Sequence, residues 1–233
     1  MFESVRIPKK LAHSPIDQAV FEIRYDGDYP GEALYGVLFE VFKNFPDNDI
    51  AELPIMQFPK YIRENDPSLR YQVYYKVSNE QFVFAIGPHS IVFLAQKPYP
   101  GWDEWKLFFK PIINEIKKKE IIRFVERISL RYSNIFAVNI FNQINAGLTI
   151  AGKSIITNPV FFCVEFDQNE IHTIINPITN SLIDVDCINT LDCNAEHFYS
   201  SYQDVIEKIH QVNENVFFGL LKEELLNSLK PEY

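Results

Sequence analysis

The chain has 233 residues, of which 47% are hydrophobic and 15% aromatic, and it contains only 8 glycines. This composition supports a sizeable core and excludes a disordered or low-complexity protein. Its length fits one large domain, or two small ones that share a sheet. The formal net charge of −9 repels phosphate backbones, so broad nucleic-acid binding is not expected.

The acidic charge lies mostly in the second half of the chain. Residues 1–120 hold 15 Lys and Arg against 17 Asp and Glu, a balance of −2. Residues 121–233 hold 7 against 14, a balance of −7. A protein partner with a basic patch would complement the second half, whereas charge that serves only solubility is the simpler explanation.

The cysteines and the apolar runs indicate a compartment. Cys163, Cys187 and Cys193 show no Cys-x-x-Cys spacing, and an odd count without a framework is typical of a reducing environment. Residues 1–20 contain no apolar run of signal-peptide length, and no stretch of about 18 apolar residues occurs. The sequence therefore predicts a cytoplasmic protein without a membrane association.

The first half reads as strand, helix, several strands and helix. A strand is predicted at about residues 17–26, and apolar residues from 34 to 45 then recur at helical spacing until Pro46. Pro54 and Pro59 leave room only for an edge strand at residues 52–60. Alternation predicts strands at 69–77, 81–86 and 91–96. A helix follows from about residue 102, in which Pro111 should introduce a kink or a division.

The second half repeats this order more loosely. A long central strand is predicted at about residues 121–138, and a short helix is one reading of residues 139–152. Further strands are predicted at 160–166, 171–175 and 181–188. A long helix begins after Cys193 and Asn194, which can cap it, and residues 217–229 extend it or form a second helix.

Together these elements predict an α+β fold with two related β-α-β(3)-α halves. The halves are residues 1–120 and residues 121–233, and they form one compact unit that shares a curved antiparallel sheet. Helices are expected to pack on one side of that sheet, because each element must bury one apolar face.

Several short motifs, taken in order, resemble a known family. They are Leu-Ala-His-Ser-Pro-Ile at 11–16, Glu-Ile-Arg-Tyr at 22–25, Tyr-Pro-Gly-Trp at 99–102, Ile-Ser-Leu-Arg-Tyr-Ser-Asn at 128–134, Leu-Ile-Asp-Val-Asp at 182–186, and His210 before Val216 and Phe217. This set resembles a sporadically distributed prokaryotic family of uncharacterised proteins, often encoded in mobile or defence-associated gene neighbourhoods. The resemblance implies a role in phage defence or as the partner of a toxin, and it implies no catalytic residues.

Charged residues on two predicted strands form the first candidate site. These residues are Glu22, Arg24, Arg123, Arg127 and Arg131. Glu22 and Arg24 share one face of the first strand, and the three later arginines share one face of the central strand. Such a cluster can bind an anionic ligand or an acidic loop of a partner through paired hydrogen bonds. The alternative is a set of structural ion pairs across strands.

Asp184 and Asp186 form the second candidate, because both carboxylates point to the same face of a strand. They can serve as partners of the arginines, as an acid–base pair or as ligands of Mg²⁺. The five histidines lack ligand spacing, and a lone Asp-x-Asp is a weak motif. A structural role is therefore favoured, and neither a metal nor a cofactor is predicted.

Three further features belong to the predicted strands. Glu126 falls on the apolar face of the central strand, where it must find a partner, or it lies at a bulge at which the face switches. Pairing with a later positive residue is favoured over a contact with a ligand in the core. Cys163 and Cys187 lie in strand patterns and are expected to be inert. Tyr71 and its aromatic neighbours are expected in the core, with Tyr74 on the opposite, polar face.

Two hypotheses for function remain. The first is a non-enzymatic cytoplasmic interaction protein that binds another protein, as the partner, antitoxin or sensor of a phage-defence or toxin system. Its acidic contacts would include Glu207, Glu214, Glu223 and Glu224, which face a basic patch on that protein. The alternative is a module for a small anionic ligand, or an enzyme of unrecognised type, that uses the Arg-rich sheet face. Homodimerisation through a sheet edge or the last helix is compatible with both.

Overall fold

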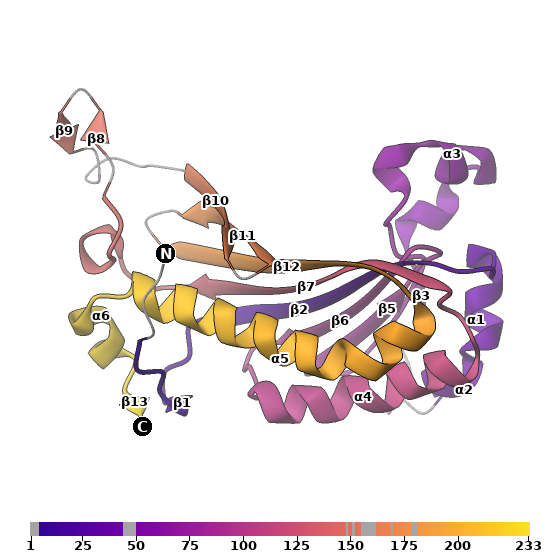
Figure 1. The fold of residues 1–233 in the computed structure, drawn as a ribbon, viewed down its shortest axis with the longest axis horizontal. Helices are drawn as coiled ribbons and strands as arrows, with labels where there is room; N and C mark the ends of the chain where they lie inside the picture. The colour runs from indigo at the N-terminus through magenta and orange to yellow at the C-terminus, as the bar shows by residue number, and fades with distance from the viewer. Residues whose placement is uncertain are drawn as a thin grey trace. The chain divides into compact units, whose positions relative to one another are not determined.

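The structure is a computed structural model that describes residues 5–43, 50–147, 149–150, 152–154, 162–168, 170–178 and 181–233. The fold is α+β, as predicted, with a large antiparallel sheet and helices on one side (Figure 1). Among the described residues, none of the helices combines the length and the apolar character that crossing a bilayer requires. The predicted relation between the two halves stays a prediction.

The strands of the main sheet follow the order β10-β11-β12-β7-β2-β6-β5-β4-β3. In chain order they are β2 (Ile16–Asp26), β3 (Ala51–Glu52), β4 (Tyr75–Ser78), β5 (Phe82–Ile86), β6 (Ser90–Gln96), β7 (Phe124–Ile135), β10 (Phe162–Gln168), β11 (Ile171–Ile178) and β12 (Leu182–Asn194). Two small pairs accompany them, formed by β1 (Lys10–Leu11) with β13 (Pro231–Glu232) and by β8 (Thr149–Ile150) with β9 (Lys153–Ser154).

The α-helices are α1 (Leu34–Val37), α2 (Phe39–Lys43), α3 (Lys60–Asn65), α4 (Trp102–Lys118), α5 (Ala195–Leu220) and α6 (Glu223–Ser228). Short 3₁₀ turns, η1 to η4, occur at Gly31–Ala33, Pro54–Gln57, Pro67–Leu69 and Phe141–Gln143. The chain divides into two compact units. Unit 1 comprises Met1–Ala19, Leu130–Asn189 and Val205–Tyr233, and unit 2 comprises Val20–Ser129 and Thr190–Asp204.

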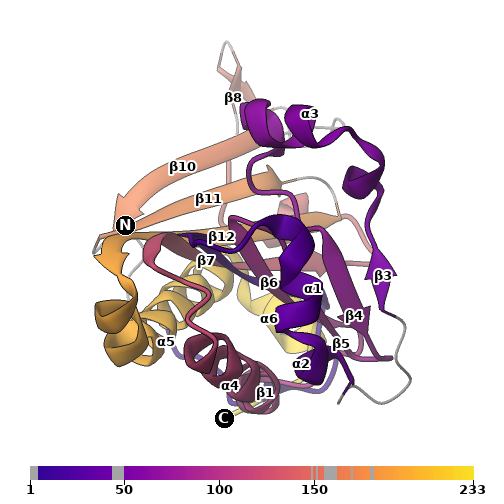
Figure 2. The same ribbon diagram turned by 90° about the vertical axis from the view of Figure 1, so that its right-hand side faces the viewer.

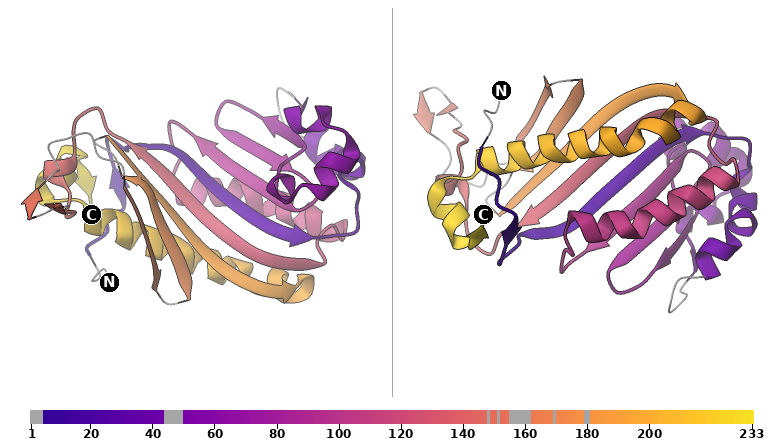
Figure 3. Two further views of the ribbon diagram at one scale, coloured as in Figure 1. Left: turned by 90° about the horizontal axis from the view of Figure 1, so that it is seen from above. Right: turned by 60° about the horizontal axis from the view of Figure 1, so that its bottom comes forward.

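The core of unit 2 is aromatic. Phe21 of β2, Phe93 of β6 and Phe109 of α4 are fully buried, with ring centroids 5.2 to 5.7 Å apart. Such ring pairs add a stabilisation of about 0.5–1.5 kcal/mol each to the burial of their area. In unit 2, α4 and the first turns of α5 lie on the same side of the strands (Figure 3).

Helix α4 shows the charge pattern that the sequence predicts. Asp103 and Glu104 lie in its first turn, and Lys117 and Lys118 lie in its last turn, as the helix dipole favours. The helix is continuous through Pro111, so the expected division does not occur.

The first predicted helix is broken. Leu38 separates α1 from α2, which follow one another in Figure 2. The apolar stripe of Leu34, Leu38 and Phe42 is nevertheless buried. Gly36 lowers the helix propensity of this segment by about 1 kcal/mol relative to Ala, which favours the short pieces. Phe45 and Pro46, which were expected to end the helix, lie outside the described residues.

The strand expected at residues 69–77 is wrong over its first part. Asp66 accepts hydrogen bonds from the backbone nitrogen and the hydroxyl of Ser68, at 2.9 and 2.7 Å, and Pro67 begins a 3₁₀ turn. Only Tyr75–Ser78 joins the sheet, as β4. Helix α3, which precedes this turn, was not predicted.

The strands predicted at 17–26, 81–86, 91–96, 121–138, 171–175 and 181–188 form, as does the described part of 160–166. Of residues 52–60, only Glu52 joins the sheet, in the edge strand β3, because Pro54 begins η2. The described part of residues 139–152 contains η4 and β8, and β8 pairs with β9 just beyond this range. The Asn194 side chain caps α5, because its Oδ1 accepts a hydrogen bond from the His197 backbone nitrogen at 2.9 Å. The turn predicted at Gln168 and Asn169 lies partly outside the described residues.

Candidate binding surface on the sheet

Strand β2 places charged side chains on the face opposite its buried residues. Phe21, Ile23 and Tyr25 are buried, and the alternate residues Glu22 and Arg24 are partly exposed. Because neighbours along a strand point to opposite faces, the charged face of β2 is the one that does not carry the aromatic core. The sequence therefore positions these charges by alternation alone.

Glu22 is the first centre of a polar cluster on this face. Its carboxylate accepts hydrogen bonds from Arg24 Nε at 3.0 Å, Arg127 Nη2 at 3.3 Å and Ser90 Oγ at 3.3 Å. The Glu22 side chain is only 18% exposed. A carboxylate at this depth is stabilised by several donors, because burial without them is costly.

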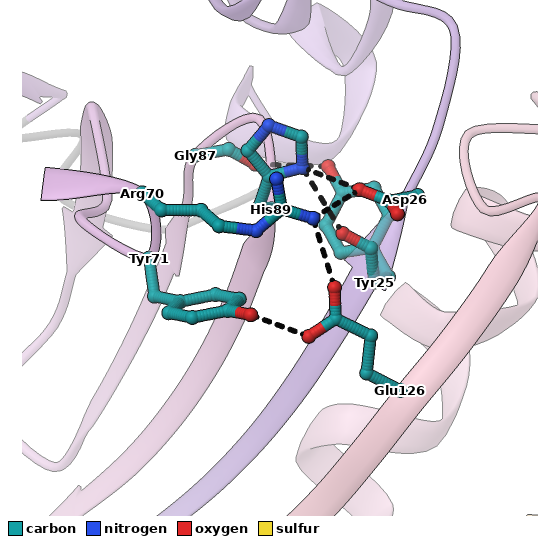
Figure 4. A network of polar contacts seen from close by, with 7 residues as sticks. All are labelled: Tyr25, Asp26, Arg70, Tyr71, Gly87, His89 and Glu126. Carbon is teal, nitrogen blue, oxygen red and sulfur yellow. Dashed lines mark hydrogen bonds and ion pairs between the residues drawn. The ribbon is translucent and has the colours of Figure 1, made fainter. Parts of the chain in front are cut away.

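Glu126 is the second centre (Figure 4). Tyr71 donates its hydroxyl to Glu126 Oε2 at 2.5 Å, and Arg70 donates Nη2 to Glu126 Oε1 at 2.9 Å. The same Arg70 nitrogen also donates to Asp26 Oδ1 at 2.8 Å. Arg70 therefore bridges carboxylates on β2 and β7.

His89 extends this network at the hairpin between β5 and β6. Its Nδ1 lies 2.9 Å from Asp26 Oδ1 and 3.3 Å from the Tyr25 carbonyl oxygen (Figure 4). The Tyr25 hydroxyl donates to the Gly87 carbonyl at 2.8 Å. The hairpin is thus held to the end of β2 by both side chains and backbone.

Tyr71 joins the two centres. The Arg24 guanidinium lies over its ring at 4.1 Å, and the Arg70 guanidinium lies 5.5 Å from the same centroid. A cation over an aromatic face is stabilised by about 0.5–1 kcal/mol at partly exposed sites. We call the set the polar cluster of unit 2. It consists of Glu22, Arg24, Asp26, Arg70, Tyr71, His89, Ser90, Glu126 and Arg127.

The cluster holds Glu126 in its charged form. Burial opposes its ionisation, but hydrogen bonds from Tyr71 and Arg70 outweigh burial and keep the pKa of Glu126 below its usual value. Burial, followed by the hydrogen bond to Glu126, raises the pKa of the Tyr71 hydroxyl. The hydrogen bond to Glu126 likewise raises the pKa of Arg70. All three groups therefore keep their ordinary charge at neutral pH.

Gly87 allows the segment that carries Arg70 and Tyr71 to pack onto the sheet. A Cβ at Gly87 would lie 2.2 Å from the Gln72 carbonyl oxygen and 3.0 Å from the Val73 Cα. Both atoms belong to the backbone, so neither can move aside alone. The Tyr74 nitrogen donates to the Ile86 carbonyl at 2.8 Å, which continues the contact into β4.

Two tyrosines lie opposite to expectation. Tyr74 was predicted on the polar face, but it is buried, and the Arg63 guanidinium lies 5.0 Å from its ring centroid. Tyr71 was predicted in the core, but it belongs to the polar cluster. The reason is that residues 70–74 do not form a strand, so the alternation that assigned these faces does not apply to them.

Glu126 also differs from its predicted pairing. It was expected to pair with a later positive residue, whereas its partners Arg70 and Tyr71 come earlier in the chain. Val125 and Ile128 are both buried although they are three residues apart, whereas regular alternation places residues two or four apart on one face. The buried face of β7 therefore shifts by one residue between them. The predicted switch of faces therefore occurs here, and it places Glu126 and Arg127 in the same cluster.

The remaining predicted residues lie elsewhere. Arg123 pairs with Asp28, and its side chain is 71% exposed. In unit 1, Arg131 binds both oxygens of Asp184, with Nε at 2.8 and 2.9 Å and Nη2 at 2.6 Å. Ser133 Oγ donates to the same carboxylate at 2.7 Å.

The Arg131–Asp184 pair has the geometry of the cross-strand ion pair that was weighed as a structural alternative. The Asp184 side chain is only 4% exposed, whereas that of Arg131 is 50% exposed. The hydrogen bond to Asp184 raises the pKa of Arg131, and Asp186 adds to this through its charge. The predicted residues therefore divide into a group in unit 2, a group in unit 1 and the separate Arg123.

Sequence reasoning missed several members of the cluster, among them Asp26, Arg70, His89 and Ser90. Arg70 lies 44 residues from Asp26 and 56 from Glu126 in the chain. No local pattern relates such distant positions. A capping signal at Asp66 and Pro67 marks the turn that redirects this segment, and it was the one sign available in the sequence.

In the described part of the chain, the structure supports neither a nucleophilic role for Cys187 nor a metal site. Cys187 is buried, and burial raises the pKa of its thiol to about 12. A thiol in that state is a poor nucleophile at neutral pH. Within the described ranges, no group of three His, Cys, Asp or Glu residues gathers in a way that would hold a metal ion.

The chain was compared with known proteins. A scan against protein-family models matches no family, and a search of the curated proteins finds no match. The resemblance that the sequence motifs suggest therefore stays a prediction.

Proposed function

We propose that this chain is a protein-binding protein and that the polar cluster of unit 2 is part of its binding surface. One observation supports this most directly: Tyr71, Arg24 and Arg70 are partly exposed and are already held in place. The arginines lie against the Tyr71 ring, and hydrogen bonds to Glu22 and Glu126 fix all three side chains. Tyr and Arg are the residue types most often found at the energetic centres of protein interfaces.

Preorganisation is the physical advantage of such a surface. Ordering a long side chain on binding costs about 0.5–1.5 kcal/mol, and a side chain that is already fixed avoids this cost. Arg24 is fixed by Glu22 and by the Tyr71 ring, and it keeps 28% of its side chain exposed. A partner would gain hydrogen bonds and stacking at little cost in side-chain entropy.

The charge of the cluster defines the partner that fits it. Three arginines face three carboxylates, so the cluster is close to neutral and suits a polar surface of mixed charge. The excess of acidic residues elsewhere in the chain favours a partner that also carries a basic patch. On the family resemblance, we propose a toxin or another defence component as this partner, in the cytoplasm.

Radical footprinting tests the proposal without any substitution. Hydroxyl radicals oxidise exposed tyrosines, and Tyr61 in the same unit, with 68% of its surface exposed, serves as an internal control. Oxidation of Tyr71 should be several-fold lower in extracts of the source cells than in the purified chain, while Tyr61 reacts equally in both. Equal oxidation of Tyr71 in extract and in isolation would argue against a partner on this surface.

A small anionic ligand is a second candidate, favoured by Arg127. Its Nε is buried and makes no hydrogen bond within the described part of the chain, although Nη2 binds Glu22. A carboxylate or phosphate oxygen would satisfy this donor. Phosphate or succinate should then raise the melting temperature of the wild type but not that of Arg127→Met. No shift with either anion would exclude this use of Arg127 for both compounds.

A further inference from the structure

Strand β10 forms the outer edge of the sheet in unit 1. It stands at one end of the strand order and pairs antiparallel with β11. Within the described ranges, no other strand pairs with its outer side. Half of the backbone N–H and C=O groups of an edge strand point away from the sheet, and they can bind an added strand.

One face of this edge is apolar. Val164 lies opposite Ile175, and Phe166 lies opposite Thr173, in the register of β10 and β11. Ile175 and Thr173 are buried, so this face is continuous with the core of unit 1. Val164 nevertheless remains 37% exposed, because the core does not extend beyond the edge strand. Apolar side chains of an added strand would cover it.

The other face of the edge is acidic. Glu165 and Asp167 point to this face, and their side chains are 59% and 84% exposed. His172 on β11 lies near both, with Nδ1 2.9 Å from Asp167 and Nε2 3.7 Å from Glu165. Asp186 lies on the same face of β12, the strand beyond β11, where it is opposite Ile174. Basic side chains of an added strand would lie beside Glu165 and Asp167 on β10.

We infer that the outer edge of β10 binds an extended segment of a partner protein in which Lys or Arg alternates with apolar residues. Main-chain hydrogen bonds would add this segment to the sheet, its basic residues would face Glu165 and Asp167, and its apolar residues would cover Val164. Opposite charges on neighbouring strands are stabilising, which selects this chemistry. The site uses none of the residues of the polar cluster of unit 2.

A second copy of the chain is a poorer occupant of this edge. If two copies of β10 paired antiparallel over their full length, Glu165 of one copy would lie opposite Glu165 of the other. Like charges that face each other across strands are destabilising. Charges on an edge strand can also serve to prevent any pairing with another chain. A measurement of backbone pairing at β10 therefore separates the two roles.

The test uses a fluorescein-labelled peptide of the length of β10, 7 residues, that alternates Val with Lys. A matched peptide carries Glu in place of Lys, and a third carries the Lys sequence with N-methyl groups on alternate amides. Binding to the full chain is measured by anisotropy at two salt concentrations. The variant Glu165→Lys/Asp167→Lys is compared with Glu196→Lys/Asp204→Lys, which makes the same change of charge at two exposed positions of α5.

The Lys peptide should bind the wild type and the α5 control variant alike. The β10 variant should lose roughly tenfold in affinity for it and should prefer the Glu peptide, since repulsion replaces attraction at two positions. N-methylation should abolish binding, because the side chains remain but the backbone donors do not. Equal binding of the N-methylated peptide, equal loss in the α5 control variant, or no measurable binding of the Lys peptide would overturn the inference.

Discussion

The hydrogen bond between Tyr71 and Glu126 provides a quantitative test of the polar cluster. Tyr71→Phe removes the hydroxyl that lies 2.5 Å from Glu126, and Glu126→Ala removes the carboxylate. Hydrogen bonds to charged groups contribute about 1.5–3 kcal/mol when buried. The Glu126 side chain is 25% exposed, and screening by solvent reduces the expected coupling to about 1 kcal/mol.

The single changes should differ in size. Tyr71→Phe should lower the free energy of unfolding by about 1 kcal/mol, the net contribution of one such bond. Glu126→Ala should lower it by about 2 kcal/mol, because it also removes the bond from Arg70 and part of the packing at β7. Urea unfolding of the wild type, both single variants and the double variant gives the coupling energy directly.

The exposed pair Arg123–Asp28 in the same unit is the matched control. Its side chains are 71% and 57% exposed, so a cycle on this pair should give a coupling of less than about 0.5 kcal/mol. If the effects of the Tyr71 and Glu126 changes were additive, or no more strongly coupled than those of the control pair, the polar cluster would not be preorganised by this hydrogen bond.

Three further predictions concern stability. Gly87→Ala should cost about 2 kcal/mol, because its Cβ would overlap the Gln72 carbonyl, and the loss should appear as a lower urea midpoint. Asn213→Ala should cost about 2 kcal/mol, because its buried side chain donates to backbone carbonyls of β7 and β12, at 3.2 and 2.9 Å; the exposed Asn215→Ala should cost far less. Burial, and then the charge of Glu207, raises the pKa of Glu214 to about 7. The folded state therefore keeps this proton above the ordinary pKa of a glutamate, and stability should fall as pH rises from about 5 to about 8. Glu214→Gln should reduce that fall by about 1 kcal/mol in urea unfolding, whereas an unchanged pH dependence would refute the assignment.

The regular parts of the fold were predictable from the sequence because they depend on local periodicity. Alternation located β2, β5 and β6, and helical spacing with terminal charges located α4. The Asn194 cap was predictable for the same reason, since capping involves residues three apart. These features need no knowledge of which segments meet in space.

The candidate site was predictable only in part. Alternation along β2 predicted that Glu22 and Arg24 share its polar face, and alternation along β7 predicted a polar position for Arg127. Arg70 and Tyr71 arrive through a 3₁₀ turn and an irregular segment, and Gly87 makes the space for them. Contacts of this kind join residues that are distant in the chain, so only the folded structure reveals them.

The hypothesis that acidic residues of the last two helices bind a basic partner also becomes more specific. Glu207 and Glu214 are only partly exposed on α5, and the raised pKa of Glu214 weakens its charge near neutral pH. Glu223 and Glu224 are exposed in the first turn of α6. Charge reversal at Glu223 and Glu224 is therefore the cleaner test of a basic partner at these helices.

Native mass spectrometry tests the central proposal, a protein partner on the polar cluster, most directly. The tagged wild type, the double variant Arg24→Ala/Tyr71→Leu and the control Arg123→Ala would be purified gently from the source cells, with folding verified by circular dichroism. We expect a stoichiometric second protein on the wild type and on Arg123→Ala, and its loss from the double variant. A complex that persists on the folded double variant, or a wild-type chain that carries no second protein, would contradict the proposal.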